Sequence, residues 1–336
     1  MNVRVEGMAD RPSRALLAWL APCAISILVY PFLLTEFHLA IGSRSTEGAL
    51  LAALGMLLVF GVPAVCLVCA RKLSNLGSVG GLRFASLGVA APTLYVFMGV
   101  LNYMAGNRIP DQAVWIVLWA LLAYLTLKPS RTSATVQPQP GLLRFVHGIT
   151  AAILAVYVLF HLANHLFGLL GPEWHHRVME LGRRVYRAQL IEPLLVAAML
   201  FQIATGVDLF RRWTSRPLDA FRVFQLASGL YLAIFILGHM NSVFIFARRY
   251  LRIETDWSFA TGGPTGLIVD PWNVRLIPHY WLGTFFVLTH LAGGARVVLA
   301  AHGADAKTLS AVWTFGLVAS AGIASAILLG MCGLRI

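Results

Sequence analysis

The sequence predicts an all-α integral membrane protein with about nine transmembrane helices, and its composition is the first reason. Of the 336 residues, 58% are hydrophobic and only 12% are charged, and the mean hydropathy is +0.75. Apolar stretches of about 17–25 residues, each long enough to cross a hydrocarbon core, recur along the chain. Because backbone groups in lipid must be paired within their own segment, these stretches are expected to be helices.

The apolar stretches give nine predicted spans, of which the fourth is the shortest. They cover residues 15–35, 48–70, 84–105, 112–128, 146–170, 191–210, 223–247, 277–300 and 309–333. Residues 129–141 contain three prolines and no apolar period, which predicts a linker. It divides the chain into a four-helix region of unassigned role (1–128) and a five-helix region (142–336). We expect a short interfacial helix at about 171–190, and a partner-facing or functional loop at 248–278.

The net charge of +12 raises the question of a nucleic-acid partner, but the distribution of arginine and lysine argues against one. The basic residues sit in short connections and form no stripe. They are concentrated at the N-terminus and after the second, fourth and sixth spans. The positive-inside rule then places the N-terminus in the cytoplasm and the C-terminus outside. We expect a multi-pass protein of the inner (plasma) membrane. The fifth and seventh connections also carry arginines and depart from this pattern.

Cysteine usage indicates packing rather than chemistry. Cys23, Cys66, Cys69 and Cys332 all lie in apolar stretches. Cys66 and Cys69 share one helix face, but the sequence offers no second pair to complete a metal site. We therefore expect buried, hydrophobic roles for all four.

Histidine is the most informative residue type in the chain. Nine of the ten histidines lie between His147 and His302, and four lie in the interior of the apolar stretches, away from their ends, namely His161, His165, His239 and His290. An ionisable side chain in hydrocarbon is costly and indicates function. Neutral imidazole is a common axial ligand of haem iron, which would explain all four together. A single buried histidine is often only a hydrogen-bonded packing residue, but three or four matched in depth on alternate helices favour ligation.

The positions of these histidines along their spans predict two layers. His161 and His239 lie at similar distances from the same end of two spans that run in the same direction, so at 1.5 Å rise per residue they share one depth. Two facing imidazoles are what bis-histidine haem b ligation requires. His165, one turn further out, would replace His161 or bond a haem propionate. Gln202 and His290 lie deeper, in a second layer. This layer contains only one histidine, so the inner site lacks one of the two histidine ligands.

A family resemblance covers residues 142–333. The motifs that carry it are Arg144-Phe-Val-His-Gly148, His161-Leu-Ala-Asn-His165, Gln202-Ile-Ala-Thr-Gly206, Gln225-Leu-Ala-Ser-Gly229 followed by His239, and His290-Leu-Ala-Gly-Gly294. In order and spacing this region resembles the five-helix cytochrome b membrane anchor of succinate dehydrogenases and fumarate reductases. The N-terminal half lies outside the resemblance.

The resemblance implies two stacked b haems. It places His161 and His239 on the outer iron and His290 on the inner one, where Gln202 stands in place of the usual second histidine. One haem b is therefore expected, and two if His290 has another partner. Arg144, His147 and Arg296 would contact propionates or quinone. The alternative for the two arginines is that their side chains only extend to the membrane interface. The alternative for His147 is that it only lies at the interface.

The resemblance also implies a non-catalytic subunit that passes electrons between quinone and a cytoplasmic flavoprotein with an iron–sulfur protein. Two other readings stay open. One is a stand-alone mono-haem cytochrome b that exchanges electrons with quinone. The other is a non-redox transporter or scaffold that has lost its haem.

Overall fold

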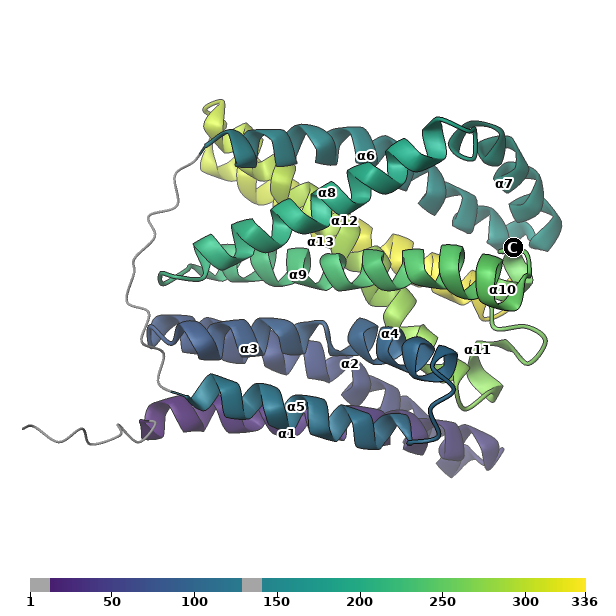
Figure 1. Ribbon diagram of the computed structural model, residues 1–336, viewed down its shortest axis with the longest axis horizontal. Coiled ribbons are helices and arrows are strands. Elements are labelled where there is room, and N and C mark those ends of the chain that lie inside the picture. Colours follow the sequence, from purple (N-terminus) through teal and green to yellow (C-terminus); the bar gives the residue numbers. More distant parts are fainter. Residues whose placement is uncertain (1–12, 129–140) are drawn as a thin grey trace, which may run out of the picture.

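The computed structural model describes residues 13–128 and 141–336, and within these residues every regular element is a helix (Figure 1). The predicted linker lies outside the described residues except for Gly141. In chain order the elements are α1 (Arg14–Gly42), α2 (Thr46–Asn75), α3 (Val79–Val89), α4 (Ala91–Met104), α5 (Asp111–Leu127), α6 (Leu142–Leu166), η1 (Phe167–Leu170), α7 (Pro172–Tyr186), α8 (Ile191–Trp213), α9 (Ala220–Met240), η2 (Asn241–Leu251), α10 (Trp257–Ala260), α11 (Gly266–Val269), η3 (Asn273–Arg275), α12 (Leu276–Ala301) and α13 (Ala306–Met331).

Seven helices in the described part of the chain are long and apolar enough to cross a membrane, and the bent pair α3–α4 adds an eighth if it counts as one span. Large apolar side chains on these helices point outward, among them Leu57, Val156, Leu194 and Phe315. Water would disfavour so much exposed apolar surface, whereas lipid favours it. The chain is thus a multi-pass helical membrane protein, as predicted.

Two of the nine predicted spans take a different form. The third is divided at Ala90, where α3 and α4 meet at 69°. Pro92 explains the bend, because proline lacks an N–H and its ring clashes with the carbonyl four residues earlier, at Gly88. The fourth is α5, which has 17 residues and is shorter than the seven spanning helices.

Helix α9 lies at the centre of the molecule. It packs against α8 and α12 on one side and against α3 and α4 on the other (Figure 1). The contact with α4 is close at Gly238, where a Cβ atom would lie 3.2 Å from the Cβ of Phe97. The helices before the predicted linker therefore share one hydrophobic core with those after it.

The helix ends define two ends of the bundle. Helix α7 lies at one end, with α10 and α11, and we name it the α7 end (Figure 1). The opposite end, where α3 and α6 begin, is named the α3 end. There Arg83 of α3 donates to Thr214 Oγ1 (2.9 Å) and to the carbonyl of Arg211 (2.8 Å), just where α8 terminates.

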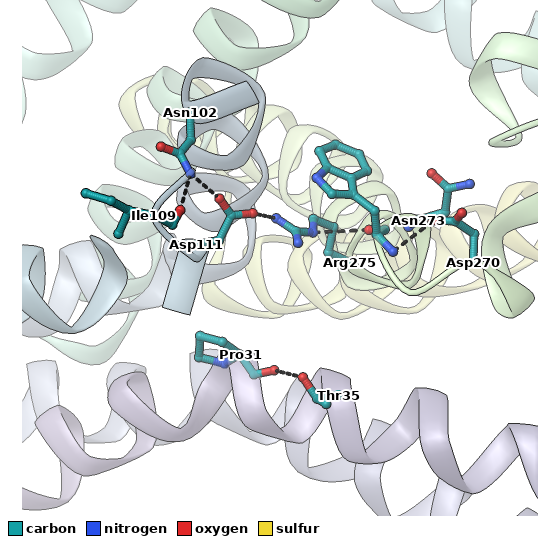
Figure 2. Close-up of polar contacts among 9 residues, drawn as sticks. Pro31, Thr35, Asn102, Ile109, Asp111, Asp270, Asn273 and Arg275 are labelled. Atoms are coloured by element: carbon teal, nitrogen blue, oxygen red, sulfur yellow. Dashed lines mark hydrogen bonds and ion pairs between the residues drawn. The ribbon is translucent and has the colours of Figure 1, made fainter. Parts of the chain in front are cut away.

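A buried ion pair joins the N-terminal helices to the C-terminal ones near the α7 end. Arg275 Nη1 donates to Asp111 Oδ2 at 2.7 Å, and the two side chains are 9% and 14% exposed. Figure 2 shows Asn102 donating to the other carboxylate oxygen of Asp111, at 2.8 Å. The guanidinium also lies over the rings of Tyr95 and Trp272. This network fixes the start of α5 against the start of α12.

The connections at the α7 end are more helical than the sequence indicates. The short helix predicted at about 171–190 is confirmed as α7, which buries His175 and Met179 on one face, and its interfacial position stays a prediction. The predicted loop from 248 to 278 is wrong at both ends, because α9 continues as the π-helix η2 to Leu251 and α12 begins at Leu276. The charge of Arg248 does not end the helix, since Arg248 Nη1 pairs with Glu192 of α8 at 2.8 Å.

The cysteines of α1 and α2 are buried, as expected. Cys23 comes within 3.6 Å of Cys66, measured between the sulfur atoms, which the sequence did not predict. Cys332 differs from the expectation, because it is only partly buried beyond the end of α13.

Candidate functional site

The structure brings His161 of α6 and His239 of α9 together. Their ring centres are 5.9 Å apart and their planes are inclined by 71°. The equal depth predicted for these two residues is consistent with this contact. Each imidazole stacks on an aromatic ring one turn earlier in its own helix, Tyr157 behind His161 (5.8 Å, 20°) and Phe235 behind His239 (5.9 Å, 8°). The two helices thus present their imidazoles in the same way.

Further imidazoles extend this contact toward α7. His165 lies edge-on to His161, with ring centres 4.7 Å apart, and its other neighbour is His175 of α7, at 5.3 Å. His175 Nε2 is 3.2 Å from the side-chain amide nitrogen of Asn164. The ring of Trp257 covers His175 at 4.6 Å.

His279 of α12 completes the group, and the sequence analysis missed it. Its ring lies 4.7 Å from Phe235, the residue that stacks on His239. His279 is buried and stands near the start of a predicted span, so the criterion that singled out the other histidines would have found it. We call His161, His165, His175, His239 and His279 the histidine cluster.

Several polar atoms of the histidine cluster lack hydrogen-bond partners among the described residues. They are the Nδ1 atoms of His165, His175 and His279, together with Oδ1 of the neighbouring Asn164, and all four are buried. Buried polar groups in proteins are nearly always hydrogen-bonded. The α7 end therefore holds unused hydrogen-bonding capacity that suits a polar ligand group.

His175 lies in α7, outside the spanning helices, and its protonation follows from its surroundings. Burial lowers its pKa from 6.5 to about 4, and the positive charges of Arg183 and His176 add to this effect. The buried imidazole is therefore neutral at physiological pH. A neutral ring can accept a hydrogen bond.

At the α3 end the structure corrects the predicted inner layer. Gln202 contacts His147, with Nε2 3.1 Å from the His147 carbonyl and 3.3 Å from its ring Nε2. His290 is held instead by Gln225, whose Nε2 donates to the His290 carbonyl at 3.1 Å. Its Nδ1 lies 3.0 Å from Ser228 Oγ. The partner of Gln202 is His147, for which the sequence analysis offered a propionate or quinone contact or a plain interfacial position.

Arg144 and Arg296 also lie at the α3 end. The guanidinium of Arg296 sits 4.1 Å above the ring of Phe221, and its buried Nε has no partner among the described residues. Arg222 is close enough to both arginines for their charges to interact. The predicted propionate or quinone contacts of Arg144 and Arg296 stay predictions.

No protein-family model matches this chain, and no curated protein or solved structure matches it. The resemblance to the cytochrome b anchors therefore rests on the motifs quoted above.

The side chains at these positions suit a metal ion that takes most of its ligands from a cofactor rather than from the protein. Among the residues that the structure describes, no group of three or more histidine, cysteine, aspartate or glutamate side chains is arranged to hold a metal ion. Haem iron takes four nitrogens from its macrocycle and needs only one or two protein ligands. The imidazoles of His161 and His239 match that number of ligands.

Proposed function

We propose that this protein is a membrane cytochrome b, with His161 and His239 as the axial ligands of a haem b in the half of the bilayer near α7. It would carry electrons between quinone and a cytoplasmic flavoprotein with an iron–sulfur protein. The observation that carries the proposal is the 5.9 Å separation of the two imidazole ring centres on α6 and α9.

That separation fits a shared iron. An imidazole nitrogen binds a metal at about 2.0–2.1 Å, so two axial imidazoles have ring centres roughly 6 Å apart. His161 and His239 would hold the iron from α6 and α9. When bound, haem supplies reversible one-electron chemistry.

The chain's own residues orient the two ligands. Tyr157 and Phe235 stack on His161 and His239 and restrict rotation of the imidazoles. Of the two histidines of α6, His161 is the better candidate for the iron ligand. Its ring lies next to His239, whereas the ring of His165 lies next to His175. His165, with its buried and unbonded Nδ1, is then free to bond a propionate or a quinone oxygen.

The family resemblance is the basis for proposing quinone, a flavoprotein and an iron–sulfur protein as partners. In that arrangement the protein has no catalytic acid or nucleophile. Its residues would hold the haem through His161 and His239, and Tyr157 and Phe235 would orient the two rings.

Haem content of the purified protein tests the proposal. A pyridine haemochrome assay with a reduced-minus-oxidised spectrum should show b-type haem, and both His161→Ala and His239→Ala should lose it. His302→Ala, at an exposed position after α12, is the matched control and should keep the wild-type spectrum. Protein without haem, from cells able to supply it, would contradict the proposal. The alternative of a non-redox transporter or scaffold would then remain.

Copurification separates the anchor from a stand-alone cytochrome. A flavoprotein that accompanies the haem-loaded protein through mild solubilisation supports the anchor. Haem with no accompanying flavoprotein, together with reduction of the haem by a quinol, supports the stand-alone cytochrome.

A further inference from the structure

The fifth connection departs from the charge pattern of its neighbours, and the structure shows what its arginines do. Arg183 and Arg184 lie in the last turn of α7, and Arg187 is its C-terminal cap. Arg183 Nη2 donates to the carbonyl of Thr255 at 3.2 Å, and Arg187 Nη2 donates to Thr255 Oγ1 at 3.0 Å. The chain beyond η2 therefore holds two of these arginines in place, although it lies 68 and 72 residues away in the sequence.

A pocket of about 510 Å³ opens beside these arginines, and we call it the α7 pocket. The residues that line it are His176, Glu180, Arg183, Arg184, Arg187 and Glu254. Three arginines thus face two glutamates, so the lining carries a net positive charge. The volume is of the order found for small-molecule sites in proteins.

The guanidinium groups at the α7 pocket have unused hydrogen-bond donors. In the described part of the chain only Arg183 of the three has a carboxylate within ion-pair distance, that of Glu180 at 2.8 Å. The Nε atoms of Arg183 and Arg187 are buried and have no partner among the described residues. Burial, and next the charges of Arg183 and Arg248, lower the pKa of Arg187, so the cationic groups here repel one another. A bound anion would relieve this repulsion.

Helix α7 also carries an exposed apolar stripe. Trp174, Leu181 and Val185 are all exposed, and at 3.6 residues per turn they fall on one face of the helix. The buried face that contains His175 lies to one side of this stripe. On the other side, Arg184 lies between the stripe and the remaining residues of the α7 pocket. The apolar stripe and the basic pocket are therefore neighbouring faces of one helix.

The position of α7 determines what can meet these two faces. The span that ends at Leu170 leads directly into α7, and the span of α8 begins at Ile191, so α7 lies where two spans end (Figure 1). A helix with an apolar face and a basic face at such a position has the pattern of one that lies in the membrane interface. There an apolar face meets acyl chains, and guanidinium groups bind phosphate through paired hydrogen bonds. A phospholipid would contact both faces, whereas a soluble anion would contact only the pocket.

We propose that the α7 pocket binds the headgroup of an anionic phospholipid, whose acyl chains lie along Trp174, Leu181 and Val185. Arg184 and Arg187 bind the phosphate oxygens. The carboxylate of Glu254 accepts a hydrogen bond from a headgroup hydroxyl, which favours a singly charged headgroup that carries hydroxyl groups, such as that of phosphatidylglycerol. Basic pockets at the ends of membrane helices recognise lipids in this way. The site involves no haem, so the inference goes beyond the proposed function.

The melting temperature of the full-length protein, delipidated in a neutral detergent, tests this inference. Phosphatidylglycerol in mixed micelles should raise it, whereas phosphatidylcholine and inorganic phosphate should have little effect. The phosphatidylglycerol concentration that gives half of the shift should increase about tenfold or more in Arg184→Gln, because one charge-assisted hydrogen bond is lost. Arg211→Gln is the matched control, since it removes the same charge from a side chain that is 70% exposed at the α3 end.

Leu181→Gln tests the contact with the acyl chains. Leu181 is exposed, so the substitution leaves the core intact, but it places a polar group in the stripe and should weaken the response to phosphatidylglycerol. Native mass spectrometry of mildly solubilised protein provides a second readout. Wild type and Arg211→Gln should retain one anionic phospholipid per chain, and Arg184→Gln and Leu181→Gln should lose it.

Three results would overturn the inference. Equal shifts with phosphatidylcholine and phosphatidylglycerol would mean that the headgroup is not recognised. A shift with inorganic phosphate that equals the shift with phosphatidylglycerol and is unchanged in Leu181→Gln would identify a soluble anion instead. No shift with any probe, together with no retained phospholipid, would leave the α7 pocket without a lipid. All of these measurements can be made on protein without haem, so the proposed function is tested separately.

Discussion

Arg275 and Asp111 form an ion pair at 2.7 Å between residues that are 164 positions apart in the chain. The pair lies in the core at the α7 end, and Asn102 holds the second oxygen of the carboxylate (Figure 2). Asp111 is also the first residue of α5, where the helix dipole favours a negative charge. The first five helices are thus fixed to the histidine-bearing helices by charge as well as by apolar packing.

Asp111→Asn should destabilise the protein strongly. It leaves the guanidinium of Arg275 buried and without its counter-charge, which typically costs about 3–5 kcal/mol in the free energy of unfolding. The melting temperature in detergent measures the effect. Asp208→Asn is the matched control, because the pair Asp208–Arg212 is 33% and 42% exposed and should contribute under about 1 kcal/mol. Equal losses from both variants would contradict a buried, coupled pair.

Gly99→Ala should weaken the same network from the side of α4. A Cβ atom there would lie 2.5 Å from Nη1 of Arg275 and 3.0 Å from Oδ2 of Asp111, so the pair would have to move. We expect a loss of about 1–3 kcal/mol, as for other overpacked sites. At Gly61, in α2, nothing lies within 4 Å of the added Cβ, and Gly61→Ala should be neutral or slightly stabilising. A stabilising Gly99→Ala would show that the network adapts without cost.

The stacked aromatic rings behind the outer histidines should control the orientation of the ligands. Phe235→Leu removes the parallel ring behind His239 but retains apolar volume, so the haem should stay bound with a changed low-spin spectrum. Phe224→Leu is the control, since Phe224 packs on Phe286 and Trp313, away from the histidine cluster. The electron paramagnetic resonance spectrum of the oxidised protein provides the measurement, and identical spectra for both variants would refute the orienting role.

The features that the sequence predicts well are those that depend on local regularity. Span lengths follow from the thickness of the bilayer, and the level of His161 and His239 follows from the constant rise of an α-helix. These two residues are near neighbours in the structure. The apolar face of α7 is equally local, since it is a periodic pattern within one segment.

The features that the sequence predicts poorly depend on contacts between distant segments. From the sequence alone, Arg275 and Asp111 each look like an ordinary charged residue in a connection between helices. Only the fold shows that they pair. Pro92 bends the third span, whereas Pro22, Pro31 and Pro63 lie inside continuous helices, so proline alone does not reveal a break. The sequence analysis did not assign His147 to the inner layer, because its contact with Gln202 joins two different helices, α6 and α8.

His175 should make stability depend on pH at the α7 end. Its pKa is about 4 in the folded protein, because of burial above all, against 6.5 for the unperturbed side chain. The unfolded chain therefore binds a proton as the pH falls through 6.5 while the folded chain does not, so stability decreases between pH 6.5 and about 4, by at most about 1.4 kcal/mol per pH unit. Above pH 6.5 both states are neutral and the contribution is constant.

His175→Asn should remove this part of the pH dependence. The melting temperature is measured from pH 7.5 to 5 for wild type, His175→Asn and His176→Asn, and the exposed neighbour His176 serves as the control. The wild-type and His176→Asn curves should fall together as the pH decreases, and the His175→Asn curve should fall less steeply. The variant should start lower at pH 7.5, since it alters the contacts with Asn164 and Trp257. Parallel curves for all three proteins would mean that His175 takes up a proton as readily in the folded protein as in the unfolded chain, so that water reaches its ring.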